Sequence, residues 1–282
     1  YLASENVRFR DKKFTFDAST ATDDIQQGDV VVSYPKLEKK YSTFSVSVDP
    51  GDVRKGDLLG IMGANALGKT TLMKMIAGVE KPDSGMIDKK IKISYKPQYL
   101  TNDIDVEVVT MLDKANGGSI EDSTEEEQII EPLRIKKLYN KSMKYLSGGE
   151  LQKVAVATCL LQKVDLYALD EPSAFLDVED RIAVGKFLQK FCRSFGKSAI
   201  VIDHDLQLMD LVSDSMVIFE GTSSIEGHAT SPLPKIDAMN RFLKSLDITF
   251  RRDEKSRRPR VNKDGSRLDK DQKGSQNYYY KK

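Results

Sequence analysis

Short apolar runs alternate along the chain with longer segments in which apolar residues recur at helical spacing. The runs at Leu58–Met62, Asp165–Asp170 and Ser198–Asp203 are largely apolar, which is typical of strands buried on both faces of a parallel sheet. Val178–Phe195, between the last two runs, has a helical period, so a right-handed strand–helix–strand crossover is expected. The pattern therefore predicts an α/β core.

The regions on either side of this core have different periodicities. Alternating polar and apolar residues predict strands near the start of the chain, and residues 100–160 have helical character without strand signals. The further predicted strands are Lys13–Asp17, Asp29–Ser33, Tyr41–Val48, Lys92–Tyr95 and Ser215–Phe219. The expected fold class is α/β, a mostly parallel sheet with an antiparallel β edge and a helical insertion at about residues 100–160.

A glycine-rich loop separates the strand at Leu58–Met62 from a helix expected over Thr70–Gly78. Its sequence from Gly63 to Thr70 matches the P-loop pattern G-x-x-x-x-G-K-[ST], and a chance glycine turn does not explain this strand–turn–helix context. Backbone N–H groups of such a loop surround phosphates. We expect Lys69 to contact the β- and γ-phosphates and Thr70 to coordinate Mg²⁺. The predicted nucleotide contacts are Gly63, Asn65, Ala66, Leu67, Gly68, Lys69, Thr70 and Thr71, the last at the α-phosphate.

Two acids follow the strand that ends at Asp170. The carboxyl edge of an open α/β sheet is where ligands bind, so Asp170 is expected to hold Mg²⁺ directly or through water. Glu171 is expected to orient and polarise the attacking water, since phosphoryl transfer depends mostly on positioning and charge stabilisation. Taken alone, such acids are more often a helix cap than a metal site. With the P-loop they form a Walker A and Walker B pair.

The run Leu146-Ser147-Gly148-Gly149-Glu150 lies between these two motifs. A serine followed by two glycines at a helix start makes a second anion-binding N-terminus without bulky side chains. A simple N-cap would explain Ser147 but not the glycines. One domain cannot easily close two helix N-termini onto one γ-phosphate.

With these motifs in this order, the sequence resembles the ABC ATPase superfamily, whose signature motif is similar to Leu-Ser-Gly-Gly-Glu. The resemblance implies that Ser147, Gly148, Gly149 and Glu150 contact ATP held by an opposite domain. It also implies that Gln98 is the Q-loop glutamine, which senses Mg²⁺ and water, and that residues 173–177 form the D-loop. His204 matches the switch histidine, which contacts the γ-phosphate and water.

Two further positions are matched to the superfamily. Phe44 stands where an aromatic side chain lies under the adenine, with Tyr41 as the second candidate, although either ring can belong to the core. The superfamily usually has glycine where Ala66 stands. If that position needs a positive φ, alanine costs about 1 kcal/mol, and slower turnover or a shifted loop is expected while ATP binding is retained.

A narrower resemblance runs from about Tyr1 to Tyr280. It is carried by the runs 94–98, 146–153 and 170–177, and by the tail motifs 248–253 and 258–263. These are similar to the second nucleotide-binding domain of E-subfamily ABC proteins, the ribosome-recycling ATPases also called RNase L inhibitors. The tail is the most specific part, because a generic transporter ATPase has no reason to carry it.

The resemblance implies the following organisation and partners. Residues 1–230 would form the nucleotide-binding domain and residues 231–282 a C-terminal hinge and basic tail. A first nucleotide-binding domain, and before it iron–sulfur clusters, would lie upstream on the same polypeptide. Domain closure on Mg-ATP would split ribosomes into subunits. The partners would be the small ribosomal subunit, rRNA and a release-factor-like protein. The protein would be cytoplasmic and would have no membrane partner. The alternatives are the ATPase subunit of an ABC membrane transporter and a scaffold that binds ATP only for its shape. Glu171 and His204 argue against the scaffold.

Composition and charge add three points. The 282 residues include 39% hydrophobic and 31% charged residues. No apolar run approaches the ~20 residues that a membrane-spanning helix needs. The start at Tyr1 favours a piece of a longer polypeptide. Cys159 and Cys192 are expected to be buried thiols. Residues 251–282 carry a charge of +7 and the remainder −6, which fits either an RNA partner or a solvated tail. The arginines expected at the domain hinge, at rRNA phosphate, or at both are Arg251, Arg252, Arg257, Arg258 and Arg260.

Overall fold

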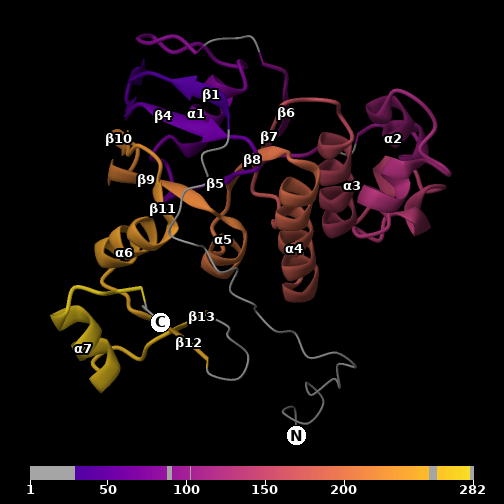
Figure 1. The fold of residues 1–282 in the computed structure, drawn as a ribbon. Coiled ribbons are helices and arrows are strands. Elements are labelled where there is room, and N and C mark those ends of the chain that lie inside the picture. The colour runs from indigo at the N-terminus through magenta and orange to yellow at the C-terminus, as the bar shows by residue number, and fades with distance from the viewer. Residues whose placement is uncertain (1–28, 88–90, 102, 254–258, 280–282) are drawn as a thin grey trace, which may run out of the picture.

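A computed structural model describes residues 29–87, 91–101, 103–253 and 259–279 (Figure 1). The strand predicted at Lys13–Asp17, and Arg257 and Arg258, lie outside these residues. No helix within the described ranges is both long and apolar enough to span a membrane.

A mixed sheet of nine strands forms the centre of the fold. The strand order is β2-β3-β10-β9-β5-β8-β7-β6, and β11 pairs with β9 outside this path. Strands β9, β5, β8, β7 and β6 are mutually parallel. Their bounds are β5 Leu58–Gly63, β6 Ile93–Lys96, β7 Leu166–Asp170, β8 Ser198–Ile202 and β9 Ser215–Thr222. The predicted parallel core is therefore confirmed.

The antiparallel edge is also present, and it is larger than the sequence predicted. β3 (Ser45–Val48) pairs antiparallel with β2 (Leu37–Lys40), and β10 (Glu226–Ala229) pairs antiparallel with β9. β11 is Leu233–Pro234, and β1 (Val30–Tyr34) and β4 (Gly51–Arg54) make a separate two-stranded sheet. Strands β2, β4, β10 and β11 were not predicted, because they are short and carry many polar residues.

Alternate residues of the central strands face two different hydrophobic clusters. In β5, Leu58 and Met62 belong to one cluster, whereas Leu59 and Ile61 belong to the other. Helix α1 (Lys69–Ile76) packs into the second cluster. The helices α3 (Gly148–Leu160), α4 (Val178–Phe195) and α5 (Leu206–Val212) pack into the first. The helix after the glycine-rich loop and the helix after Ser147 therefore cover opposite faces of the sheet.

The helical insertion is present but divided into short pieces. It contains α2 (Val108–Asn116), a π-helical turn (Glu126–Ile130), two 3₁₀ turns (Lys136–Leu138 and Met143–Tyr145) and α3. The carboxylate of the buried Glu126 accepts hydrogen bonds from the Tyr139 hydroxyl at 2.8 Å and the Asp122 N–H at 2.9 Å. These local polar contacts interrupt a continuous helix.

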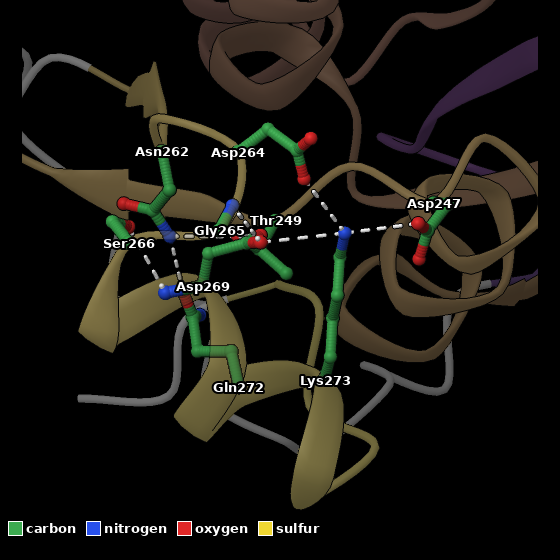
Figure 2. Close-up of polar contacts among 9 residues, drawn as sticks. All are labelled: Asp247, Thr249, Asn262, Asp264, Gly265, Ser266, Asp269, Gln272 and Lys273. Atoms are coloured by element: carbon green, nitrogen blue, oxygen red, sulfur yellow. Dashed lines mark hydrogen bonds and ion pairs between the residues drawn. The ribbon is translucent and has the colours of Figure 1, made fainter.

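Residues 235–253 and 259–279 form a folded unit and not a solvated tail. It comprises α6 (Lys235–Ser245), β12 (Phe250–Arg252), β13 (Pro259–Val261) and α7 (Arg267–Gly274). Figure 2 shows its polar contacts. The Asn262 amide donates to the Thr249 hydroxyl at 2.8 Å, and the Lys273 ammonium pairs with Asp247 at 2.9 Å and Asp269 at 3.3 Å. These contacts connect the segment that follows α6 to α7 and to the residue that follows β13.

Arg252 was expected at the domain hinge, at rRNA phosphate, or at both. The structure corrects the expectation that Arg252 contacts RNA. Its guanidinium Nη2 donates to both carboxylate oxygens of Asp210 on α5, at 3.1 and 3.0 Å, and to the Tyr279 hydroxyl at 3.2 Å. The side chains of Arg252 and Asp210 are 9% and 4% exposed. Arg251 and Arg260 are exposed. The thiols of Cys159 and Cys192 are buried and free, as expected.

The buried pair makes a stability prediction. Arg252→Met leaves the Asp210 carboxylate buried without its cation, so the free energy of unfolding should fall by about 3 kcal/mol. The neighbouring exposed Arg251→Met is the matched control and should change it by less than about 0.5 kcal/mol. Urea unfolding of the chain measures both values. Equal effects of the two changes would contradict the buried position of Arg252.

Candidate nucleotide-binding and catalytic site

The glycine-rich loop leaves the end of β5 and closes around its own lysine. The Lys69 ammonium donates to the carbonyl oxygens of Gly63 at 2.9 Å and Ala64 at 2.7 Å, and its side chain is buried. Burial lowers the pKa of Lys69, and the carboxylates of Glu171 and Asp170 oppose this shift. Gly68, with a φ of 99°, caps α1. The loop is thus shaped as the P-loop pattern predicts, with a cation at its centre.

The connection between β9 and β10 supports this loop from the side. The Ser224 N–H donates to the Ala66 carbonyl at 3.0 Å, and the Ser223 hydroxyl donates to the Asn65 carbonyl at 2.9 Å. At Gly227, a Cβ atom would lie 1.9 Å from the Leu67 carbonyl oxygen, so only glycine allows β10 to approach so closely. This support was not predicted, because it brings together segments 158 residues apart in the sequence.

Ala66 has a φ of 58°, in the left-handed region. This is the condition under which alanine was expected to strain the loop. The strain is of the order of 1 kcal/mol, which the contacts from Ser223 and Ser224 offset.

Asp170 ends β7 as a fully buried carboxylate. Among the described residues, no hydrogen bond of ordinary geometry reaches either of its oxygens. Burial raises the pKa of Asp170, and the nearby Thr70 hydroxyl offsets part of the increase. A carboxylate and a hydroxyl are the oxygen ligands that Mg²⁺ prefers, and a buried carboxylate without donors is stabilised by a cation. These residues therefore fit a Mg²⁺ site.

The three predicted catalytic side chains meet at one atom. The Oε1 atom of Glu171 accepts a hydrogen bond from the Gln98 amide at 2.8 Å and lies 2.9 Å from Nε2 of His204. Gln98 follows β6, Glu171 follows β7 and His204 follows β8, so the adjacent carboxyl ends of three parallel strands bring them together. This arrangement can hold a water molecule beside Glu171 and move its proton.

Two buried side chains that sequence analysis missed hold the backbone of the acidic pair. The Lys96 ammonium donates to the carbonyl oxygens of Asp170 at 2.7 Å and Glu171 at 3.2 Å, and the Gln152 amide donates to that of Glu171 at 2.6 Å. Burial lowers the pKa of Lys96 to about 8. A lysine inside a strand of a buried parallel sheet was the available signal, since lysine is rarely buried without a partner.

Both aromatic candidates lie beside the loop. The rings of Tyr41 and Phe44 stack with centroids 6.2 Å apart and an interplanar angle of 24°. A Cβ atom at Gly68 would lie 3.2 Å from Cζ of Phe44, and the Tyr41 hydroxyl contacts Thr71 and Glu80. The pair forms an aromatic surface next to the start of α1.

The Ser147 turn faces solvent. The Ser147 hydroxyl accepts from the Glu150 N–H at 3.3 Å, and the Glu150 carboxylate accepts from the Ser147 N–H at 3.0 Å, which completes a capping box. Ser147 and Gly148 are exposed. Gly148 lies against Phe175, a residue that is 76% exposed. The turn is therefore accessible from the surface of this chain.

The fold, the P-loop and the paired acids define a P-loop ATPase domain of the ABC type. A profile of the family described as "ABC transporter" matches residues 49–174. ABC transporter E family member 3 of Arabidopsis thaliana is 32% identical over 168 residues, which are 57% of this chain and 93% of that protein. The chain belongs to the E family of ABC proteins.

Longer relatives and solved structures agree. The chain is 43% identical to an uncharacterised ABC transporter ATP-binding protein of Methanocaldococcus jannaschii and 38% identical to translation initiation factor RLI1 of Saccharomyces cerevisiae. Each match covers 99% of this chain but 46% of the relative, so the chain spans about half their length.

Two solved structures match the whole chain. A complex of an archaeal ribosomal stalk protein with the archaeal ribosome recycling factor matches at 43% identity and a TM-score of 0.89, covering 100% of this chain and 54% of the matched one. A structure of ribosome-bound archaeal Pelota and ABCE1 matches at 42% identity and a TM-score of 0.89. This match covers 100% of this chain and 47% of the matched one.

The left-handed φ of Ala66 makes the first site prediction. Ala66→Gly should raise the free energy of unfolding by about 0.5–1 kcal/mol, because glycine adopts this φ without strain. Ala64→Gly is the matched control in the same loop, at a residue without a positive φ, and should not stabilise the chain. Urea unfolding measures both changes. No gain from Ala66→Gly would contradict the strained loop.

The capping box makes a prediction about pH. The hydrogen bond from the Ser147 N–H, with that from Lys141, lowers the pKa of Glu150 from 4.5 to about 2. The carboxylate therefore stabilises the folded state fully above the unfolded pKa, and this stabilisation is lost as the pH falls from 4.5 toward 2. Glu150→Gln should lower the free energy of unfolding by about 1 kcal/mol at neutral pH and by less in acid. The exposed Glu127→Gln serves as control. A pH-independent difference would refute the capping role.

Proposed function

We propose that this chain is the second ATPase domain of a ribosome-recycling E-family protein and hydrolyses Mg-ATP enclosed by its P-loop and the signature turn of a first domain. The convergence of Gln98 and His204 on the Glu171 carboxylate, beside the buried Asp170, carries this proposal. The resemblance to a ribosome recycling factor and to a ribosome-bound protein supports the cellular role.

Each side chain of the site takes one task in this mechanism. The P-loop N–H groups and Lys69 bind the phosphates, and the ring of Phe44 or Tyr41 lies under the adenine. Thr70, Asp170 and Gln98 would hold Mg²⁺, which when bound neutralises charge on the phosphates. The Glu171 carboxylate orients the attacking water and accepts its proton, and His204 contacts that water and the γ-phosphate. Lys69 leaves the carbonyl oxygens of Gly63 and Ala64 to reach the phosphates.

Closure requires a partner domain, which we place upstream on the same polypeptide. Its Ser-Gly-Gly turn would cover the ATP bound here, and Ser147, Gly148, Gly149 and Glu150 would cover the ATP bound there. Closing moves the attached domains and strains the ribosome, and hydrolysis reopens the cleft by removing the γ-phosphate contacts. The small ribosomal subunit, its rRNA and a release-factor-like protein are the proposed partners.

The C-terminal unit supplies the proposed RNA contact. Arg251 and Arg260 are exposed on adjacent strands, opposite each other in the β12–β13 pair. Two such arginines can neutralise RNA phosphates without reading sequence. The membrane-transporter alternative gives no role to this unit.

The mechanism predicts the effect of Glu171→Gln in the full-length protein. ATP binding should stay within about threefold, whereas steady-state hydrolysis at this site should fall by about 100-fold or more, because glutamine cannot accept the proton. Phosphate release and equilibrium ATP binding measure the two quantities. The exposed Glu179→Gln is the control and should leave both unchanged.

ATP should then trap the Glu171→Gln protein in the closed state on small ribosomal subunits, as measured by cosedimentation. Unimpaired multiple-turnover hydrolysis would refute the assignment of Glu171. Binding to membranes in place of ribosomal subunits would refute the proposed partner.

A further inference from the structure

The backbone at Glu171 is held in a strained conformation by several separate elements. Glu171 has a φ of 49°, a left-handed conformation that is strained for a residue other than glycine. Its N–H donates to the Ile202 carbonyl on β8 at 2.8 Å, and its carbonyl accepts from Gln152 at 2.6 Å and Lys96 at 3.2 Å. Because the surroundings impose this conformation, moving any of these groups changes where the Glu171 carboxylate points.

Gln152 connects this backbone to the signature turn. It lies on α3, the helix capped by Ser147, and is fully buried. Five residues of α-helix separate the two along the axis by about 7.5 Å, and hydrogen bonds along α3 make the segment move as one body. A shift of the Ser147 turn therefore moves the Gln152 amide, which contacts Glu171 directly.

A second contact also links the signature turn to the Glu171 backbone. A Cβ atom at Gly149 would lie 3.1 Å from the Phe175 carbonyl oxygen, so the signature turn rests on the loop that follows Glu171. In that loop, the Ala174 N–H donates to the Glu171 carbonyl at 3.3 Å. The turn thus touches the Glu171 backbone through α3 and through this loop.

We propose that Gln152 is a positioning residue that links the seating of the signature turn on the neighbouring domain's nucleotide to the orientation of Glu171 in its own domain. The inference rests on the proposed function, because it takes Glu171 as the group that orients water. Occupancy of the other ATP site then sets the turnover rate at this one, with α3 as the connecting element.

The test compares two backgrounds of the full-length protein. In one, the Walker B glutamate of the other domain is changed to glutamine, so that ATP stays bound there; in the other, its P-loop lysine is changed to alanine, so that the site stays empty. All phosphate release then comes from the site described here. The ratio of turnover between the two backgrounds measures the coupling between sites.

Gln152→Met removes the amide donor and nearly conserves the volume. It should lower kcat in the ATP-filled background by about 10-fold or more and bring the ratio near one, with the dissociation constant for ATP changed by less than about twofold. Gln189→Met is the matched control, because the Gln189 amide on α4 donates to the Leu211 carbonyl at 3.0 Å in a part-buried position outside the site. It should leave the ratio unchanged.

An unchanged ratio in Gln152→Met, or an equal change in Gln189→Met, would overturn the proposal. Should Gln152→Met fail to fold, Gln152→Asn keeps the amide but shortens its reach, and it should reduce the ratio in the same direction. The turnover of Glu171→Gln in the ATP-filled background distinguishes a failure of the proposed function from a failure of the Gln152 linkage. If Glu171→Gln keeps its turnover, the proposed function fails. If it loses turnover while both Gln152 variants keep the ratio, only the linkage fails.

Discussion

The structure depends on keeping a negative charge buried at the end of β7. The Asp170 carboxylate is inaccessible to water, and within the described part of the chain it has no hydrogen bond of ordinary geometry. Such a charge is tolerated only beside opposite charge. Lys96 and Lys69 provide it, since both lower the pKa of Asp170 against the effect of burial. Both lysines are themselves buried, so the cluster holds balanced charges at the point where the P-loop and three strand ends meet.

This balance has a consequence for chemistry. The two ammonium groups bind backbone carbonyls of the P-loop and of the acidic pair, and the carboxylate oxygens of Asp170 are left for another cation. Much of the electrostatic work of arranging these buried charges is therefore done during folding, before Lys69 exchanges its carbonyl partners for phosphates in the proposed mechanism.

The two faces of the sheet bear on the proposal that a second domain completes each ATP site. The residues of β5 alternate between two hydrophobic clusters. Helix α1 packs into one cluster and helix α3 packs into the other. The helix of the P-loop and the helix of the signature turn therefore lie on opposite faces of the sheet. An exposed Ser147 and a largely exposed Phe175 beside it are accounted for when another domain covers them.

The sequence predicted the elements that depend on local signals. The parallel strands, α4 and the helix of the P-loop have clear periodicity and end signals, and the motifs place Asp170, Glu171 and His204 correctly at the strand ends. Lys96, Gln152 and Gly227 were missed because their roles depend on contacts with distant segments. Arg252 was misread because charge alone does not distinguish an exposed arginine from one buried against Asp210. A positive φ at Ala66 was raised only as a condition, and the structure shows that the condition holds.

Electron paramagnetic resonance of Mn²⁺ tests the central claim most directly, because Mn²⁺ replaces Mg²⁺ at oxygen ligands. Titration of the full-length protein with Mn²⁺ and a non-hydrolysable ATP analogue, with and without Asp170→Asn, measures the binding of the metal at this carboxylate. The account predicts that Asp170→Asn weakens nucleotide-dependent Mn²⁺ binding at this site by about 10-fold or more, since the buried charge is lost. Unchanged Mn²⁺ affinity in Asp170→Asn would contradict it.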